Sequence, residues 1–388
     1  MGPTTTGRTR RDRAGQRSPL WARIAIGVGA LLMVLSGGSL ITGKLLLVRY
    51  ADGLTRDGGL GTAATGHASI KGPINLLLVG IDEGSGRTDE PRADSIIVAH
   101  IPASHDAVYL ASVPRDSLVD IPPDSATGYS GGKDKINAAF QAGFHGKGGR
   151  DGGLALLAET ISNLTGGSLK FNGAAIVNFD GFKDLVKAIG GVRMYVDEKV
   201  TSVHIGTNVR TGKFESPFVL HPDGTVAYQK PNVRPQVYNV GWHDLNDWQA
   251  LDYVRQRDLL ANGDSDYGRQ RHQQQFLKAV LQKTASTGVI TNPITVNKVL
   301  KSVGKAVTFY NNGVSVADWI FTLKNIRPDD MTMIRTNGGS FNSINIDGVA
   351  YEQLLPDSVR LLRDMAADDV PSFVSSHQSW ISTDTGPS

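Results

Sequence analysis

The segment YLASVPRDSLVDI, residues 109–121, joins an apolar run to a pair of opposite charges, and it indicates both the fold class and the site. The apolar residues before Pro114 are typical of a buried strand, and a proline cannot donate a hydrogen bond to a neighbouring strand. Arg115 and Asp116 are therefore expected where this strand passes into a loop, which is where open α/β sheets usually bind ligands. An arginine fork beside a carboxylate suits an anionic ligand, above all phosphate. A surface ion pair at a strand end is the alternative, and the neighbouring sequence decides between them.

Two strands upstream of this segment have aspartates at comparable positions. The apolar run 75–79 leads to Asp82, while Asp94 comes shortly before the apolar run 96–101. Carboxylate oxygens beside cations such as Arg92 can hold magnesium together with a phosphate group. Two ordinary loop aspartates are the alternative, because aspartate is common in loops.

Strand and helix patterns alternate farther along the chain. Helices are expected at 154–164 and 182–189, and strands at 174–179 and 192–196. This alternation predicts an α/β fold in which a mixed central β-sheet is covered by helices on both faces. Residues 122–153 contain many glycines and are interpreted as a long loop.

A second cluster of charged and amide side chains lies near two expected helices, 247–253 and 269–281. Its members are Arg255, Arg257, Asp266, Arg269 and Gln273. Because Arg269 and Gln273 are four residues apart, they share one face of their helix. Cations and amides at a helix start suit an oxyanion ligand. A solvated, charged helix start is the alternative.

The rest of the C-terminal half is less informative about function. Residues 203–240 are expected to form loops and an edge hairpin. The remaining elements are expected to be helices at 293–300, 316–323 and 351–365 and a strand at 331–334. All of these are assigned to packing.

Composition excludes several classes of function. The chain has 388 residues and a net charge of +3, which is too near neutral to favour nucleic acid as a partner. The absence of cysteine excludes disulfides, thiolate zinc sites and a cysteine nucleophile. Neither a G-x-x-x-x-G-K-[ST] phosphate loop nor the G-x-S-x-G elbow of serine hydrolases is present.

The N-terminal region predicts a membrane anchor. Residues 24–43 are twenty residues without a charge, about the length that a helix needs to span a bilayer. Six arginines precede this run, so the positive-inside rule leaves the N-terminus in the cytoplasm. The expected parts are a cytoplasmic basic tail 1–23, a single transmembrane helix 24–47, a linker 48–73, an extracellular folded domain 74–368 and a disordered tail 369–388. A cleaved signal peptide is the alternative.

Seven segments together resemble one known family, and they occur in the family's order. They are NLLLVGID at 75–82, RADSI at 92–96, SVPRDS at 112–117, KINAAF at 135–140, FDGFKDLVKAIGGV at 179–192, LNDWQALDYVRQR at 245–257 and DYGRQRHQQQF at 266–276. This set resembles the LytR-CpsA-Psr family. The chain departs from the family pattern at Lys187, Asp247 and His272, and Arg271 is displaced by one position from the family's arginine.

The resemblance implies a phosphotransferase at the outer face of the cytoplasmic membrane. Such an enzyme moves a secondary cell wall glycopolymer, teichoic acid or another, from a polyprenyl-diphosphate carrier to peptidoglycan through a phosphodiester bond. It implies that Asp82 and Asp94 hold Mg²⁺, and that Arg115, Asp94 and Arg92 act in catalysis. It implies further that the diphosphate binds to Arg92, Arg115, Arg255, Arg257, Arg269 and Gln273, and that Asp266 orients the arginines. The prenyl tail would lie in an apolar tunnel.

Two other classes of function stay open at this point. One is a hydrolase that only cleaves polyprenyl diphosphate to the monophosphate. The other is a non-catalytic, membrane-anchored regulator that binds lipid or wall. The general base is unassigned, because a metal-bound carboxylate such as Asp94 is a poor base and Asp116 is the other candidate.

Overall fold

The computed structural model describes most of the expected folded domain. The described residues are 55–56, 60, 70–83, 89–221, 225–286, 307–314, 319, 322–323 and 326–382. The expected tail 1–23, the anchor 24–47, the helix at 293–300 and most of that at 316–323 lie outside them. Within the described parts, no helix is both long enough and apolar enough to cross a membrane.

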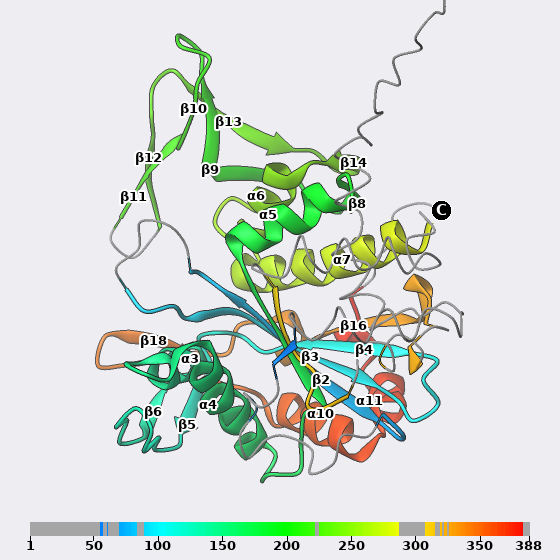
Figure 1. The fold of residues 1–388 in the computed structure, drawn as a ribbon. Helices are drawn as coiled ribbons and strands as arrows, with labels where there is room; N and C mark the ends of the chain where they lie inside the picture. The colour runs from blue at the N-terminus through cyan, green and yellow to red at the C-terminus, as the bar shows by residue number, and fades with distance from the viewer. Residues whose placement is uncertain are drawn as a thin grey trace, which may run out of the picture.

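A mixed sheet of seven strands forms the centre of the fold (Figure 1), in the order β1-β15-β7-β2-β3-β4-β16. The strands are β1 (Thr55–Arg56), β15 (Val307–Tyr310), β7 (Gly173–Asn178), β2 (Ile74–Ile81), β3 (Ala93–Ile101), β4 (Val108–Ser112) and β16 (Met331–Arg335). Strand β2 runs parallel to β7 and antiparallel to β3, which runs antiparallel to β4. The prediction of a mixed α/β sheet is confirmed.

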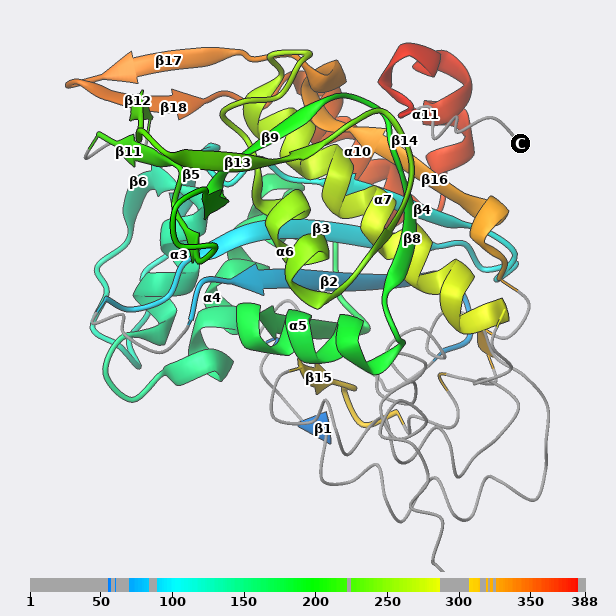
Figure 2. The ribbon, with the colours of Figure 1, turned by 90° about the horizontal axis from the view of Figure 1, so that it is seen from above.

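Both faces of this sheet are buried, because its central strands are apolar at nearly every position. Along β2, Ile74 and Leu76 belong to one core, and Leu77 and Val79 belong to the other. The first core is covered by α5 (Phe179–Ala188), α6 (Asp247–Arg255) and α7 (Ser265–Ser286) (Figure 2). The second is covered by α3 (Ile136–Phe144), α4 (Gly149–Leu164), α10 (Pro356–Ala367) and α11 (Val370–Ser376).

A small β arm rises from the face that carries α5, α6 and α7 (Figure 1). Residues 203–240, which were expected to be loops and one hairpin, are largely strands. The arm contains β9 (Val200–Asn208), β10 (Phe214–Glu215), β11 (Phe218–Leu220), β12 (Val226–Gln229) and β13 (Val233–Tyr238). Strand β8 (Val192–Val196) pairs with β14 (Gly241–Leu245), so it lies outside the central sheet.

The glycine-rich segment 122–153 was wrongly interpreted as a long loop. It contains the end of a hairpin, β5 (Leu118–Ile121) with β6 (Gly132–Lys135), then α3 and the start of α4. The glycines serve the contact between these two helices, because a Cβ at Gly143 would collide with the carbonyl oxygen of Gly152. The glycines that suggested a loop are therefore required by a close contact between two helices.

The prediction of a disordered tail from residue 369 is also wrong for residues 370–382. Helix α11 and a 3₁₀ turn at Gln378–Trp380 follow α10, and Val370 and Phe373 are fully buried. The ring of Phe373 stacks on that of His377 at 4.0 Å. The surrounding serines hid this pattern, because only a few apolar residues anchor the segment. The helix expected at 351–365 begins later, at Pro356, after a hairpin of β17 (Ser343–Ile346) and β18 (Val349–Glu352).

Candidate functional site

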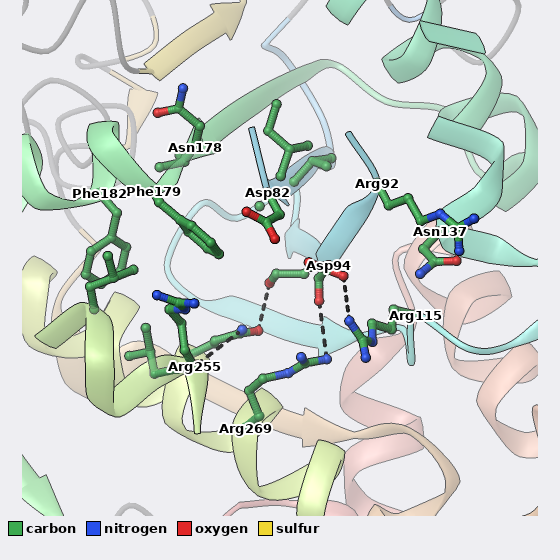
Figure 3. Close-up of a pocket in the computed structure, with 18 of the residues that line it drawn as sticks. Asp82, Arg92, Asp94, Arg115, Asn137, Asn178, Phe179, Phe182, Arg255 and Arg269 are labelled. Atoms are coloured by element: carbon green, nitrogen blue, oxygen red, sulfur yellow. Dashed lines mark hydrogen bonds and ion pairs between the residues drawn. The ribbon is translucent and has the colours of Figure 1, made fainter. Parts of the chain in front are cut away.

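Two aspartates lie side by side where β2 ends and β3 begins. Gly80 pairs with Ser95 and Ile81 with Ala93, so Asp94 is the extra residue at the register shift between these pairs, and Asp82 directly follows the last paired residue of β2. Figure 3 shows the carboxylate of Asp82 directed toward Asp94. The strands approach closely here, because a Cβ at Gly80 would lie 2.9 Å from the Cβ of Ser95. The predicted pair of carboxylates is therefore formed by strand pairing.

Arg115 approaches Asp94 from the loop after β4. Its Nη1 donates a hydrogen bond to Oδ1 of Asp94 at 2.6 Å (Figure 3). Its Nε lies 3.6 Å from a carboxylate oxygen of Asp116 and 4.0 Å from one of Asp266. Burial opposes the charge, but the three carboxylates together raise the pKa of Arg115. The guanidinium is thus charged and held in one orientation.

Helix α7 contributes Arg269 and Gln273 from one face, as the spacing predicted, and it begins early enough, at Ser265, to include Asp266 as well. Arg269 forms an ion pair with Asp266 and donates to the backbone oxygen of Asp94 at 3.5 Å. The hydroxyl of Ser95 donates to the side-chain oxygen of Gln273 at 2.7 Å. Burial lowers the pKa of Arg269, against the opposing effect of Asp266. The Nε of Arg269 has no hydrogen-bond partner among the described residues, and a buried N–H of this kind is suited to an anionic ligand.

Helix α6 ends at the same place, because its last residue is Arg255. The helix begins with a reciprocal cap between Asn246 and Gln249, so its length and register are fixed locally. The guanidinium of Arg255 lies over the ring of Phe179, 4.4 Å from its centroid. Arg257 follows the helix, and both arginines line the same cavity as Asp94.

Arg92 lies apart from the other predicted arginines. It lines the rim of the cavity, where its Nε donates to the side-chain oxygen of Gln141 at 2.7 Å. Figure 3 shows its side chain extending toward Asn137 rather than toward Asp94. The structure therefore places Arg92 at the mouth, outside the cluster around Arg115.

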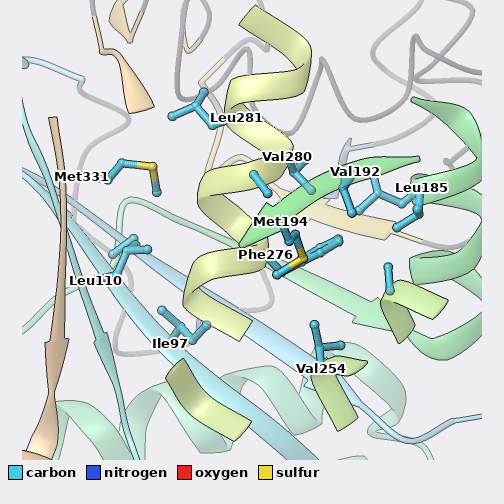
Figure 4. Packing of buried hydrophobic residues seen from close by; sticks show 14 of the residues in the cluster. Ile97, Leu110, Leu185, Val192, Met194, Val254, Phe276, Val280, Leu281 and Met331 are labelled. Carbon is cyan, nitrogen blue, oxygen red and sulfur yellow. The ribbon is translucent and has the colours of Figure 1, made fainter. Parts of the chain in front are cut away.

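These side chains share one cavity of about 950 Å³. One part of it is apolar and lies between the sheet and helices α5 and α7. Its lining there includes Leu78, Val177, Phe182, Leu185, Phe276 and Leu277. Figure 4 shows Leu185, Val254 and Phe276 in the adjoining core. The charged residues lie at the other end, so the cavity has a polar mouth and an apolar interior.

The described lining has six cationic and six acidic side chains. The cationic side chains are Arg92, Arg115, Lys135, Arg255, Arg257 and Arg269, and the acidic ones are Asp82, Asp89, Glu90, Asp94, Asp116 and Asp258. Lys135 was not selected from the sequence, although its Nζ lies 2.8 Å from Asp116 at the mouth. A lysine that precedes a helix has many structural roles, so only its place in the quoted KINAAF segment could have indicated it.

Arg271 and His272, where the chain departs from the family pattern, face away from the cavity. Arg271 forms ion pairs with Asp197, Glu198 and Asp264. Within the described residues, Asp197, Glu198 and His272 are the one group of three whose geometry could hold a metal ion. Because the Arg271 guanidinium already pairs with both carboxylates, the cluster ties α7 to the β8–β9 turn.

A model described as the LytR_cpsA_psr family matches residues 57–364. The chain is 30% identical over 223 residues to the polyisoprenyl-teichoic acid–peptidoglycan teichoic acid transferase TagU of Enterococcus faecalis. The aligned region covers 57% of each protein. It is 28% identical over 221 residues to the transferase TagV of Bacillus subtilis, which covers 57% of this chain and 46% of that protein. The chain thus spans about half the length of these curated relatives, at 57% and 46%.

The fold is shared with a solved structure. The crystal structure of B. subtilis TagV aligns with a TM-score of 0.54 and 21% identity, over 78% of this chain and 99% of that one. The family model covers well over half of the chain and includes every residue of the cavity cluster described above. The chain therefore belongs to the LytR_cpsA_psr family.

Proposed function

We propose that this protein is a phosphotransferase that moves a cell wall glycopolymer from a polyprenyl-diphosphate carrier to peptidoglycan. One observation carries the proposal: a single cavity has a cluster of arginines at its mouth and an apolar interior behind them. A polyprenyl diphosphate has the same division into a doubly charged head and a long hydrocarbon tail. The names of the relatives TagU and TagV, transferases of teichoic acid, support the same reaction.

The arginines would hold the diphosphate while the apolar lining would hold the first prenyl units. Arg115 and Arg269 come from different elements and both contact Asp94, so they converge on one point. Arginine forks bind phosphate oxygens in pairs, and they do so more strongly where water is partly excluded. Phe182 and Phe276, whose rings stack at 4.3 Å, would form part of the wall along the lipid.

The residues present fit a magnesium ion at Asp82 and Asp94. Among the described residues, no third acidic or histidine side chain comes close enough to complete a metal cage with this pair. Mg²⁺ commonly binds one or two carboxylates together with waters and substrate phosphates, so the pair suffices. With this pair included, the lining has six cationic and six acidic side chains, so a divalent ion would offset the two charges of a diphosphate diester. When bound, the ion would supply Lewis-acid stabilisation of the phosphoryl oxygens.

The protein's own part in the reaction is positioning and neutralisation of charge. An acceptor hydroxyl forms a new bond to the phosphorus next to the sugar, and the bond from that phosphorus to the bridging oxygen breaks. Polyprenyl phosphate leaves with the electron pair of that bond. Arg115 and Arg269, held by Asp94 and Asp266, would stabilise the charge that develops on the phosphoryl oxygens.

The same proposal places the protein at the cytoplasmic membrane with its catalytic domain outside. The uncharged run 24–43 and the arginines before it support one membrane-spanning helix in that orientation. An anchor would confine the enzyme to the plane in which the lipid-linked donor lies, which raises their effective concentration.

The test uses the full chain in detergent micelles with a polyprenyl-diphosphate-linked sugar and a peptidoglycan oligomer. Products are followed by mass spectrometry with and without magnesium. The expected product is sugar phosphate joined to the oligomer, formed only with magnesium. Polyprenyl phosphate without a joined product would favour the hydrolase, and intact donor that stays bound would favour the regulator.

A further inference from the structure

The mouth of the cavity offers few groups that could take a proton from an acceptor hydroxyl. Asp94 is paired with Arg115, and Asp116 is paired with Lys135. Glu90 lies 2.8 Å from a ring nitrogen of His145. A carboxylate that balances a neighbouring cation is a weakened base, because protonation would remove that attraction. The two candidates that the sequence suggested, Asp94 and Asp116, are both of this kind.

His204 lines the same cavity from the β arm. It lies on β9 and shares the lining with Leu220, Arg255 and Arg257. Neither ring nitrogen of His204 forms a hydrogen bond with the residues that the structure describes, so the ring is available to a ligand.

The backbone of His204 is held in place by a buried network. Its N–H donates to the hydroxyl oxygen of Ser202 at 3.1 Å. Ser202 in turn donates to Asp252 at 2.8 Å and accepts from Gln256 at 3.2 Å, and all three of these side chains are buried. Asp252 and Gln256 belong to the end of α6, which also carries Arg255. The backbone that carries the imidazole is thus held at a defined place relative to Arg255.

We propose that His204 accepts the proton of the acceptor hydroxyl when that hydroxyl attacks the phosphorus. The inference rests on the proposed transfer reaction. The hydroxyl oxygen bonds to phosphorus, its proton moves to a ring nitrogen of His204, and polyprenyl phosphate leaves with the electrons of the broken bond. The position of His204 fits this step, because it lines the same cavity as Arg255 and Arg257 and lies near enough to both for their charges to act on its ring.

Donor binding would strengthen this base. In the free protein, burial and then the charges of Arg255 and Arg257 lower the pKa of His204 to about 4. The imidazole is therefore neutral, which a proton acceptor requires. A diphosphate bound by the two arginines would cancel their repulsion of a proton, so the pKa of His204 would rise and its basicity with it.

The elements packed against β9 carry five other charged groups. They are Asp247 and Asp252 on α6, Asp258 after it, Glu215 on β10 and Arg234 on β13. Burial, Arg255 and Arg257 are the causes of the lowered pKa of His204, and none of these five groups is among them. The charged groups that lower the pKa of His204 are therefore the same two arginines that would bind the diphosphate.

The experiment measures transfer by the full chain at saturating donor between about pH 5 and pH 8. Variants are His204→Asn and His204→Gln, with His243→Asn as a matched control outside the cavity. We expect the wild-type rate to fall on the acidic side, and the His204 variants to be roughly a hundredfold slower and to lose that acidic limb. Donor affinity, measured separately with a fluorescent polyprenyl diphosphate, should change less than about threefold. Added imidazole should restore part of the rate to His204→Ala.

Several results would overturn the inference. Transfer by both His204 variants at the wild-type rate would do so, as would an unchanged acidic limb. Loss of rate that follows loss of donor binding would make His204 a binding residue instead. Asp89, an exposed carboxylate at the mouth, is the competitor, and removal of the limb by Asp89→Asn would transfer the role to it. A wild-type protein that binds donor but never forms a joined product would refute the proposed function itself.

Discussion

Arg115 donates from Nη1 to Oδ1 of Asp94 at 2.6 Å, and this hydrogen bond joins the loop after β4 to the start of β3. The pair fixes the two kinds of group that a diphosphate requires, a cationic fork and a carboxylate that can hold a metal ion. Both partners belong to the protein itself, so the fold sets the orientation of the groups that would receive the donor. Such preorganisation lowers the free energy of reaching the transition state, because the groups need not reorient.

Replacing Arg115 should separate catalysis from folding. We expect Arg115→Ala to lower the transfer rate by roughly a thousandfold or more, because a charge on the transferring phosphoryl group is left unbalanced. Arg115→Lys should be intermediate, since it keeps the charge but loses the fork. Rates and melting temperatures are measured together, with Arg234→Ala on the exposed arm as the control. Wild-type turnover by Arg115→Ala would remove this residue from the site.

The two aspartates should differ in their effect on magnesium dependence. Asp82→Asn should raise the magnesium concentration for half-maximal rate by roughly tenfold or more, because one charged ligand becomes neutral. Asp94→Asn should be more harmful, since it also removes the partner of Arg115. Magnesium titrations of both variants and of the exposed control Asp244→Asn test this order. Equal magnesium requirements in all of them would contradict the assignment.

A bulky residue in the apolar interior should discriminate between donors by chain length. Val177 on β7 lines this part of the cavity, and Val177→Trp would fill space that a prenyl chain needs. We expect KM to rise roughly tenfold for a long-chain donor and little for a donor with one or two prenyl units. Kinetics with both donors measure the effect. An equal rise for both would place the lipid elsewhere.

Arg271 should matter for stability rather than for donor binding. Arg271→Met would leave Asp197 and Glu198 without the buried cation that they share, which costs about 3–5 kcal/mol of unfolding free energy. The control is Arg360→Met, whose exposed pair with Asp364 should contribute less than about 1 kcal/mol. Denaturant unfolding measures both. A stable Arg271→Met protein with lost donor affinity would reverse the assignment.

Asp252 should give the stability a characteristic pH dependence. Burial raises the pKa of this carboxyl from 3.8 to about 6, although hydrogen bonds from Ser202, Tyr238 and Gln256 and the charge of Arg255 oppose the rise. The folded protein therefore retains this proton to higher pH than the unfolded chain does. The stability contribution of Asp252 is present below about pH 4 and is lost as pH rises through about 6.

The difference between wild type and Asp252→Asn isolates this group. Between about pH 4 and pH 7, wild type should lose unfolding free energy relative to the variant, and the difference should be constant above that range. Urea unfolding at several pH values measures it. A difference that does not change with pH would mean that Asp252 titrates alike in the folded and unfolded states.

Sequence patterns predicted those parts of the site that depend on near neighbours. Pro114 has no N–H to donate to a neighbouring strand, so the sequence alone predicted that Arg115 lies at a strand end. The helix spacing put Arg269 and Gln273 on one face for a similarly local reason. The apolar runs 75–79 and 96–101 likewise predicted strands of a sheet that is buried on both faces. Local sterics and periodicity are sufficient for such inferences.

Only tertiary structure decided the rest. Arg269 and Arg271 are two residues apart in one helix, and the packing of α7 on the sheet turns one into the cavity and the other into an ion-pair cluster. From the sequence alone, the glycines at 143 and 152 resemble loop residues, but in the structure they allow helices α3 and α4 to approach closely. His204 had no distinguishing sequence motif, because its neighbours Arg255 and Arg257 are about fifty residues away along the chain. Burial and charge are set by segments that meet only in the folded state, so the sequence supplied the chemical groups and the fold determined which of them act together.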